Sequence, residues 1–276
     1  MSRRRSLLSR LRLALPACAG TCAAATTLAL AVTGTASQAA DVHAPLVAAA
    51  ADLQFALDEI VQRFRHETGI AARVTYGSSG NFARQVEQGA PYELFLSADE
   101  SFVVALAARG LTRDQGALYA VGRIAIYAPL GSPLVPDAGL ENLERLLAAG
   151  RLGRFAIANP DHAPYGRAAE QSLRARGLWE AIQPRLVLGE NVAQAAQFAS
   201  GAGADGGLIA RSLALSPELQ RRGHSVALPA SLHAPLRQRM VLLDGASPAA
   251  ERLYEYLLSP ASRTILVRYG FELPPE

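Results

Sequence analysis

The stretch LVAAAADLQFALDEIVQRFRHETG, residues 46–69, joins a short apolar run to a longer amphipathic one. Leu46–Ala50 is apolar at every position, which is typical of a strand buried on both faces. Apolar side chains then recur at intervals of four, three and four residues, which places them on one helix face: Leu53, Leu57, Ile60 and Phe64. Gly69 predicts the end of that helix. The stretch therefore indicates a β-strand that leads directly into an α-helix.

The same alternation continues along the chain. Further strands are predicted at Val74–Tyr76, Leu94–Ser97, Val121–Ala128, Phe155–Ala158, Leu186–Leu188, Leu208–Ala210 and Met240–Leu243. Further helices are predicted from Ser79 to Gly89 and at Ser101–Arg109, Leu143–Ala149, Arg167–Arg176, Val192–Ala199, Ala249–Leu258 and Pro260–Val267. This order predicts an α/β fold with largely parallel sheets. The chain is long for one such sheet and has no Gly/Ser/Pro-rich linker, so we expect two lobes joined by ordered strands.

The first 40 residues hold the excess of positive charge in this chain, which has 27 basic and 24 acidic residues overall. Five Arg residues between positions 3 and 12 precede an apolar stretch, and small residues follow up to Ala40. This order predicts a secretory signal peptide, residues 1–40, cleaved near Ala39 or Ala40. A retained membrane anchor is the alternative interpretation.

The rest of the chain excludes several classes of function. Without the leader, acidic side chains outnumber basic ones, so no nucleic-acid partner is expected. Both Cys residues, Cys18 and Cys22, lie in the leader, so the mature chain should hold no disulfide and no cysteine metal site. The sequence has neither a G-x-G-x-x-G motif after a strand nor a Walker loop, and its His residues are not paired at metal-ligand spacing. We therefore expect no cofactor.

One segment approaches a catalytic motif. Gly77–Asn81, GSSGN, is close to a nucleophile elbow, although Asn81 stands where the second Gly should be. A periplasmic serine hydrolase that uses Ser79 with His162 and Asp161 remains a remote alternative. The adjacent positions of Asp161 and His162 do not readily allow the geometry of a triad.

Small or hydroxyl-bearing residues occupy four junctions at which a strand leads into a helix: Ala49–Asp52, Gly77–Asn81, Asn159–Gly166 and Gly189–Val192. The first amides of a helix lack internal partners and lie at the positive end of the helix dipole. Several such ends facing one cleft would form an anion site without Lys or Arg. Spacing alone favours the simpler interpretation that these residues are ordinary helix N-caps.

Sequence motifs favour the anion site. ARQVEQGAP at residues 83–91, NPDHAPYG at 159–166 and RYGF at 268–271 occur in this order, after AAAADLQFALDEI at 48–60. In this combination, residues 45–271 resemble the periplasmic molybdate-binding proteins of ABC transporters. The resemblance implies a two-lobed α/β periplasmic binding protein of type II. Each lobe would be a mostly parallel sheet flanked by helices, and the lobes would close over one tetrahedral oxyanion.

The resemblance also implies how the protein is organised and where it acts. Lobe 1 would comprise residues 41–121 with 241–276, and lobe 2 would comprise residues 122–240. A two-strand hinge would lie near Val121–Arg123 and Arg239–Val241. We expect a monomer in the periplasm that is not an enzyme. It would capture molybdate or tungstate and deliver it to a membrane ABC permease.

Ligand-binding residues follow from the resemblance position by position. Ser79 matches a serine that offers its amide and hydroxyl, Tyr165 matches an amide donor in the Pro-x-Gly turn, and Val192 matches a backbone donor. These three are expected to hold a metal only in the form of an oxyanion, molybdate or tungstate. At the first junction the family has Ser, or Thr followed by Asn, where this chain has Ala51 and Asp52.

Asp52 leaves the choice of anion open. An ionised carboxylate only accepts hydrogen bonds, so Asp52 would repel molybdate or tungstate. It could accept a proton from hydrogen phosphate, which keeps a binding protein for phosphate or sulfate as an alternative. From the sequence, we favour a third interpretation, in which Asp52 is a helix N-cap whose side chain binds the amides of Gln54 or Phe55.

Overall fold

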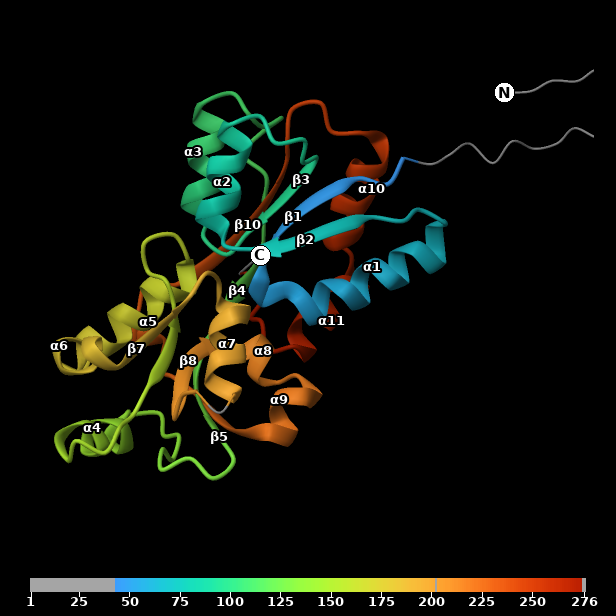
Figure 1. The fold of residues 1–276 in the computed structure, drawn as a ribbon. Coiled ribbons are helices and arrows are strands. Elements are labelled where there is room, and N and C mark those ends of the chain that lie inside the picture. Colours follow the sequence, from blue (N-terminus) through green and yellow to red (C-terminus); the bar gives the residue numbers. More distant parts are fainter. Residues whose placement is uncertain (1–42, 202, 275–276) are drawn as a thin grey trace, which may run out of the picture. The chain divides into compact units, whose positions relative to one another are not determined.

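The strand-to-helix unit predicted at residues 46–69 forms the start of the first of two sheets in the computed structural model (Figure 1). The structure describes residues 43–201 and 203–274. Strand β1 (Leu46–Ala50) continues through one 3-10 turn, η1 (Ala51–Leu53), into helix α1 (Gln54–Thr68). Gly69 ends the helix in the left-handed conformation, with φ of +74°.

The first sheet has the strand order β2-β1-β3-β10-β4. Its other strands are β2 (Arg73–Gly77), β3 (Leu94–Ser97), β4 (Ala117–Gly122) and β10 (Leu236–Leu242). Besides α1, its helices are α2 (Ser79–Glu87), α3 (Glu100–Ala108), α10 (Pro248–Leu257) and α11 (Pro260–Arg268). The second sheet has the order β7-β6-β8-β5-β9. Its strands are β5 (Ile124–Pro129), β6 (Phe155–Ala158), β7 (Leu186–Gly189), β8 (Gly206–Ala210) and β9 (Gly223–Ala227).

The second sheet is accompanied by these helices: α4 (Glu141–Ala148), α5 (Pro164–Ala175), α6 (Trp179–Ile182), η2 (Gln183–Arg185), α7 (Val192–Ser200), α8 (Arg211–Ala214), α9 (Pro217–Arg222) and η3 (Ala230–Leu232). In each sheet a single strand runs against the other four, β10 in the first and β5 in the second. The predicted α/β class with mostly parallel sheets is therefore confirmed.

Alternating side chains of β1 pack on opposite faces of the first sheet. Val47 and Ala49 lie in the cluster formed with α1, α10 and α11. Ala48 lies in a second cluster, with α2 and α3. The sheet is thus covered on both faces (Figure 1), which explains why β1 reads as an uninterrupted apolar run.

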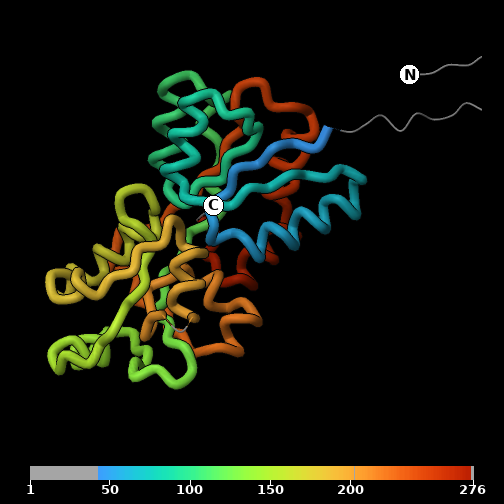
Figure 2. The backbone as a smooth tube through the Cα atoms, viewed as in Figure 1, coloured from blue at the N-terminus to red at the C-terminus, as the bar shows by residue number. Residues whose placement is uncertain are grey.

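The chain crosses between the two sheets twice (Figure 2). Only Arg123 separates β4 from β5, so one predicted strand, Val121–Ala128, is in fact two strands in different sheets. The return lies between β9 and β10, at residues 228–235. Arg239–Val241, where we expected the second hinge segment, instead lies inside β10 and pairs with β3 and β4.

The predicted signal peptide, residues 1–40, lies outside the described residues. Within 43–201 and 203–274, no helix combines the length and apolar character required to cross a membrane.

The apolar face of α1 supplies the first test of the fold. Leu57 is fully buried in the core between α1 and the first sheet. Leu57→Ala is expected to lower the free energy of unfolding by about 2–5 kcal/mol, since it removes buried methyl groups and leaves a cavity. Leu130→Ala, at a 63% exposed position, is the matched control and should change it by about 0.5 kcal/mol or less. Equal effects in urea denaturation would contradict the predicted core.

Candidate functional site

The five predicted ligand residues line one small cavity. Ala51 and Asp52 follow β1, and Ser79 begins α2. Tyr165 and Val192 lie at the starts of α5 and α7, beside the second sheet. The rest of the lining is mainly small or apolar, including Ala50, Gly77, Ala98, Ala163 and Pro164. Strand ends from both sheets thus meet at this cavity.

Three of these residues occupy helix positions whose amides have no intrahelical acceptor. Ser79 and Val192 are the first residues of their helices, and Tyr165 is the second residue of α5, after Pro164. The side chain of Asn191 caps α7 by accepting from the amides of Ala193 and Gln194, which follow Val192. Among the described residues, no acceptor is found for the amides of Ser79, Tyr165 and Val192. These amides are the uncharged donors that an anion site requires.

The hydroxyl of Ser79 is also oriented. Its Oγ accepts a hydrogen bond from the Ala98 amide at 3.0 Å, and the residue is fully buried. A serine hydroxyl that accepts in this way keeps its own hydrogen for another partner. Ser79 can therefore offer a guest both an amide and a hydroxyl donor.

Direct contacts join the two sides of the cavity. The carbonyl oxygen of His162 accepts from Ser78 Oγ at 2.5 Å and from the Gly80 amide at 3.0 Å. A Cβ at Gly80 would lie 2.6 Å from that carbonyl oxygen, so only glycine permits this approach. A further contact joins the two sides: Ser212 Oγ, on α8 beside the second sheet, donates to the carbonyl oxygen of Asp52, which follows β1 of the first sheet, at 2.7 Å.

This geometry gives the remote hydrolase alternative no support. The His162 ring contacts Ser78 Oγ, at 3.0 Å from Nδ1, and its Nε2 lies 3.6 Å from a Glu190 carboxylate oxygen. Within the described part of the chain, Ser79 has no hydrogen bond to His162 or Asp161. A base positioned to activate the Ser79 hydroxyl is therefore missing from these contacts.

Asp52 is not the N-cap that we favoured from the sequence. Asp52 lies within the 3-10 turn η1, the N-cap position of α1 is Leu53, and neither η1 nor α1 has a side-chain cap. The carboxylate Oδ2 instead accepts from Gln238 Nε2 at 2.5 Å and from the Tyr165 hydroxyl at 3.0 Å. Oδ1 is buried and has no hydrogen-bond partner among the described residues. Burial raises the pKa of Asp52 to about 6, although the hydrogen bonds from Gln238 and Tyr165 act in the opposite direction.

Gln238 and Tyr119 are site-shaping residues that the sequence did not reveal. Tyr119, on β4, donates to Gln238 Oε1 at 2.8 Å, which turns the amide Nε2 of Gln238 towards Asp52. Gly122 ends β4 directly against Tyr165, since a Cβ there would lie 2.3 Å from the Tyr165 hydroxyl oxygen. Burial raises the pKa of both phenols well above the ordinary value, so both remain neutral donors.

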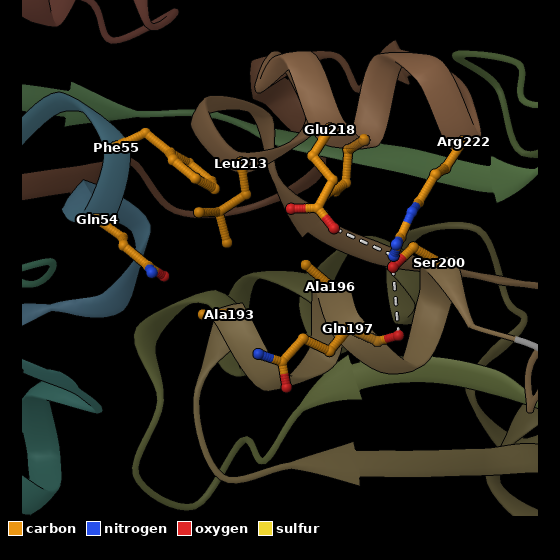
Figure 3. A pocket seen from close by; sticks show the side chains of 10 residues that line it. Gln54, Phe55, Ala193, Ala196, Gln197, Ser200, Leu213, Glu218 and Arg222 are labelled. Atoms are coloured by element: carbon orange, nitrogen blue, oxygen red, sulfur yellow. Dashed lines mark hydrogen bonds and ion pairs between the residues drawn. The ribbon is translucent and has the colours of Figure 1, made fainter.

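A second, larger pocket lies where the first turn of α1 meets α7, α8 and α9 (Figure 3). Its charged side chains, Glu218 and Arg222, pair with each other at 3.2 Å. Gln54, Phe55 and Leu213 contribute amide and apolar surface. Because Arg222 is already paired with a carboxylate, this pocket is less suited to binding an anion than the smaller cavity is.

Comparison with known proteins places the chain in a family. Residues 45–272 match the family described as bacterial extracellular solute-binding protein. The molybdate-binding protein ModA of Azotobacter vinelandii is 34% identical over 241 residues, which cover 86% of this chain and 92% of that protein. The chain belongs to the bacterial extracellular solute-binding protein family. The resemblance to molybdate-binding proteins inferred from the motifs is thereby confirmed.

Other relatives of this solute-binding protein agree. ModA of Rhodobacter capsulatus is 33% identical over 229 residues, 82% of this chain and 87% of that protein. The solved structure of the periplasmic molybdate-binding protein of A. vinelandii superimposes with a TM-score of 0.74 at 27% identity, and covers 84% of this chain and 100% of that one. The predicted two-lobed type II fold is therefore confirmed.

The raised pKa of Asp52 makes the stability of this solute-binding protein depend on pH. The folded protein binds the Asp52 proton more tightly than the unfolded chain does, so the carboxylate lowers stability above about pH 6 and this loss fades towards about pH 4. Asp52→Asn should therefore raise the free energy of unfolding of the ligand-free protein by up to about 3 kcal/mol at about pH 8 and by little at about pH 4.

Urea denaturation at both pH values measures this difference. Asp161→Asn removes an exposed carboxylate and should change stability by about 0.5 kcal/mol or less at either pH. A gain for Asp52→Asn of the same size at both pH values would contradict the assigned titration.

Proposed function

We propose that this chain captures a tetrahedral oxyanion, molybdate or tungstate, in the small cavity between the two sheets. The observation that carries the proposal is the meeting of three helix-start amides, those of Ser79, Tyr165 and Val192, at one cavity. These residues are buried, and their amides have no acceptor among the described residues. The Ser79 hydroxyl adds a fourth donor. ModA relatives that are named for molybdate binding support the same guest.

Uncharged donors suit a guest that has to be released again. The lining contains no basic side chain, so the guest would be held by partial charges on amides and a hydroxyl, and by the dipoles of α2, α5 and α7. Exclusion of water strengthens each such hydrogen bond, since the effective dielectric constant falls. Selectivity would rest on cavity size, because a ring of donors sized for molybdate or tungstate holds the smaller sulfate ion loosely.

The wider role follows from family membership. We infer a periplasmic protein, exported by a signal peptide within residues 1–40, that delivers its guest to a membrane ABC permease. The protein would act as a monomer, without a cofactor and without catalysing a reaction. The names of the relative and of the family support this, since they describe a molybdate-binding protein and an extracellular solute-binding protein.

Asp52 favours hydrogen phosphate as a second candidate guest. Asp52 lines the cavity, and its Oδ1 has no hydrogen-bond partner among the described residues. If the carboxylate is ionised, Oδ1 could accept a hydrogen bond from the hydroxyl of hydrogen phosphate. Sulfate has no such proton at neutral pH, so Asp52 gives it no advantage.

Calorimetric titration with molybdate, tungstate, sulfate and phosphate tests the guest. We expect molybdate and tungstate to bind with one site per chain, and sulfate to bind more weakly. Phosphate binding without molybdate or tungstate binding would favour the second candidate. Absence of binding heat with all four anions, in a protein shown to be folded by circular dichroism, would contradict the oxyanion site.

Ser79→Ala tests the donor set. Loss of one hydroxyl that donates to a charged guest should weaken binding by about 10- to 100-fold, which corresponds to about 1.5–3 kcal/mol. The amide of residue 79 remains, so some affinity should persist. Ser101→Ala removes an exposed hydroxyl near the start of α3 and should leave the dissociation constant unchanged. Equal affinities for the Ser79→Ala protein and its parent would contradict the assigned role.

A further inference from the structure

We propose that Asp52 binds the guest as a neutral acid through Oδ1, so that capture of a fully deprotonated dianion takes up one proton from solvent. Asp52 then determines which protonation state of the guest can bind, because the guest and the Asp52 carboxyl group share one proton. This inference rests on the proposed function, since it concerns the same cavity.

The hydrogen bonds of Asp52 assign the proton to one oxygen. Oδ2 already accepts from Gln238 and Tyr165, and a proton on Oδ2 would compete with these two donors. Oδ1 has no hydrogen-bond partner among the described residues, although Asp52 is only 1% exposed and lines the cavity. A buried polar atom without a partner is costly unless it gains one. A protonated Oδ1 gains that partner when it donates to an oxygen of the guest.

The donors to Oδ2 are fixed in that role. The Gln238 amide cannot reverse without losing the hydrogen bond that Tyr119 donates to its Oε1. The Tyr165 hydroxyl donates to Oδ2 and lies 3.3 Å from Gln238 Nε2, which is itself a donor. The carboxyl group therefore keeps one orientation, with Oδ2 towards the protein and Oδ1 left for the guest.

Among the residues that the structure describes, no basic side chain pairs with the Asp52 carboxylate. The titratable groups that face it are the phenols of Tyr165 on α5 and Tyr119 on β4, both neutral. Helix α7 carries no charged residue. Several charged side chains on the other neighbouring elements lie against other residues: Asp58 with Tyr76, Arg167 with Asp99, Arg237 and Arg239 with Glu100, Arg123 with Glu272, and Arg211 beside Gly270. A dianion beside an ionised Asp52 would place like charges together in a buried site, which favours protonation of the carboxyl.

The proton balance differs between guests. With molybdate or tungstate, the Asp52 carboxylate, one proton from solvent and the dianion give a complex in which Oδ1–H donates to a guest oxygen. With hydrogen phosphate, the guest brings the proton and its hydroxyl donates to the Oδ1 carboxylate. Both complexes contain one shared proton, but only the first takes it from solvent.

Calorimetric titration of the mature protein in two buffers of different protonation enthalpy counts this proton. At about pH 8 we expect uptake of about one proton per molybdate bound, and none per phosphate if phosphate binds. Between about pH 7 and pH 9 the dissociation constant for molybdate should rise about tenfold per pH unit, because the free carboxyl is ionised over this range.

Asp52→Asn provides a permanently neutral counterpart. Its amide oxygen can accept from Gln238 and Tyr165, and its amide nitrogen can donate from the position of Oδ1. We expect this variant to bind molybdate at about pH 8 at least as tightly as the parent, without proton uptake and with an affinity independent of pH. Asp161→Asn, which removes an exposed carboxylate from the NPDHAPYG segment, should keep the proton uptake of the parent.

The outcomes separate this inference from the proposed function. Molybdate binding by the parent with no proton uptake and no pH dependence would overturn the role of Asp52 and leave the molybdate function standing. Failure of both the parent and the Asn variant to bind any of the four anions would overturn both. Phosphate binding by the parent, replaced by molybdate binding in Asp52→Asn, would overturn molybdate as the natural guest and, with it, the role of Asp52 as a neutral donor.

Discussion

Unpartnered amides at the first turns of helices are the constraint from which the rest of the site follows. A buried anion needs donors, and three helix starts supply them without a basic side chain among the lining residues. Alternation of strand and helix places the end of each parallel strand and the start of the next helix at the same edge of the sheet. Two such sheets, facing each other at these edges, bring Ser79 together with Tyr165 and Val192.

Small residues make this approach possible. Gly80 allows its amide to reach the His162 carbonyl oxygen, and Gly122 leaves room for the Tyr165 hydroxyl. The alanines at the end of β1 serve the same purpose, since Ala50 and Ala51 are buried and line the cavity. These positions contribute little apolar area to the core. Stability comes instead from large residues in the cores between helices and sheets, such as Leu57 on α1.

Periodicity and motifs predicted most strands, helices and cavity-lining residues, because these depend on neighbouring positions in the sequence. They did not predict hydrogen bonds between residues far apart in the chain. The residues that line the cavity could be predicted because each lies in a short strand-to-helix motif. The partners of Asp52 could not, because Gln238 is 186 positions away. Gln238 is a fully buried polar residue within β10, so it interrupts the apolar pattern that would have marked the start of this strand. The N-cap prediction failed because the 3-10 turn between β1 and α1 leaves no distinct signal in the sequence.

The two carboxyl oxygens of Asp52 have different tasks. Oδ2 binds other parts of the protein, whereas Oδ1 is left to bind the anion. Oδ2 joins the turn after β1 to Gln238 on β10 within the first sheet, and to Tyr165 on α5, which lies beside the second sheet. A carboxyl group can accept through Oδ2 whether or not Oδ1 carries a proton. The links between the sheets therefore do not require a particular protonation state, whereas the interaction with an anion does. A single buried carboxyl can in this way hold the site together and still select which form of the guest it admits.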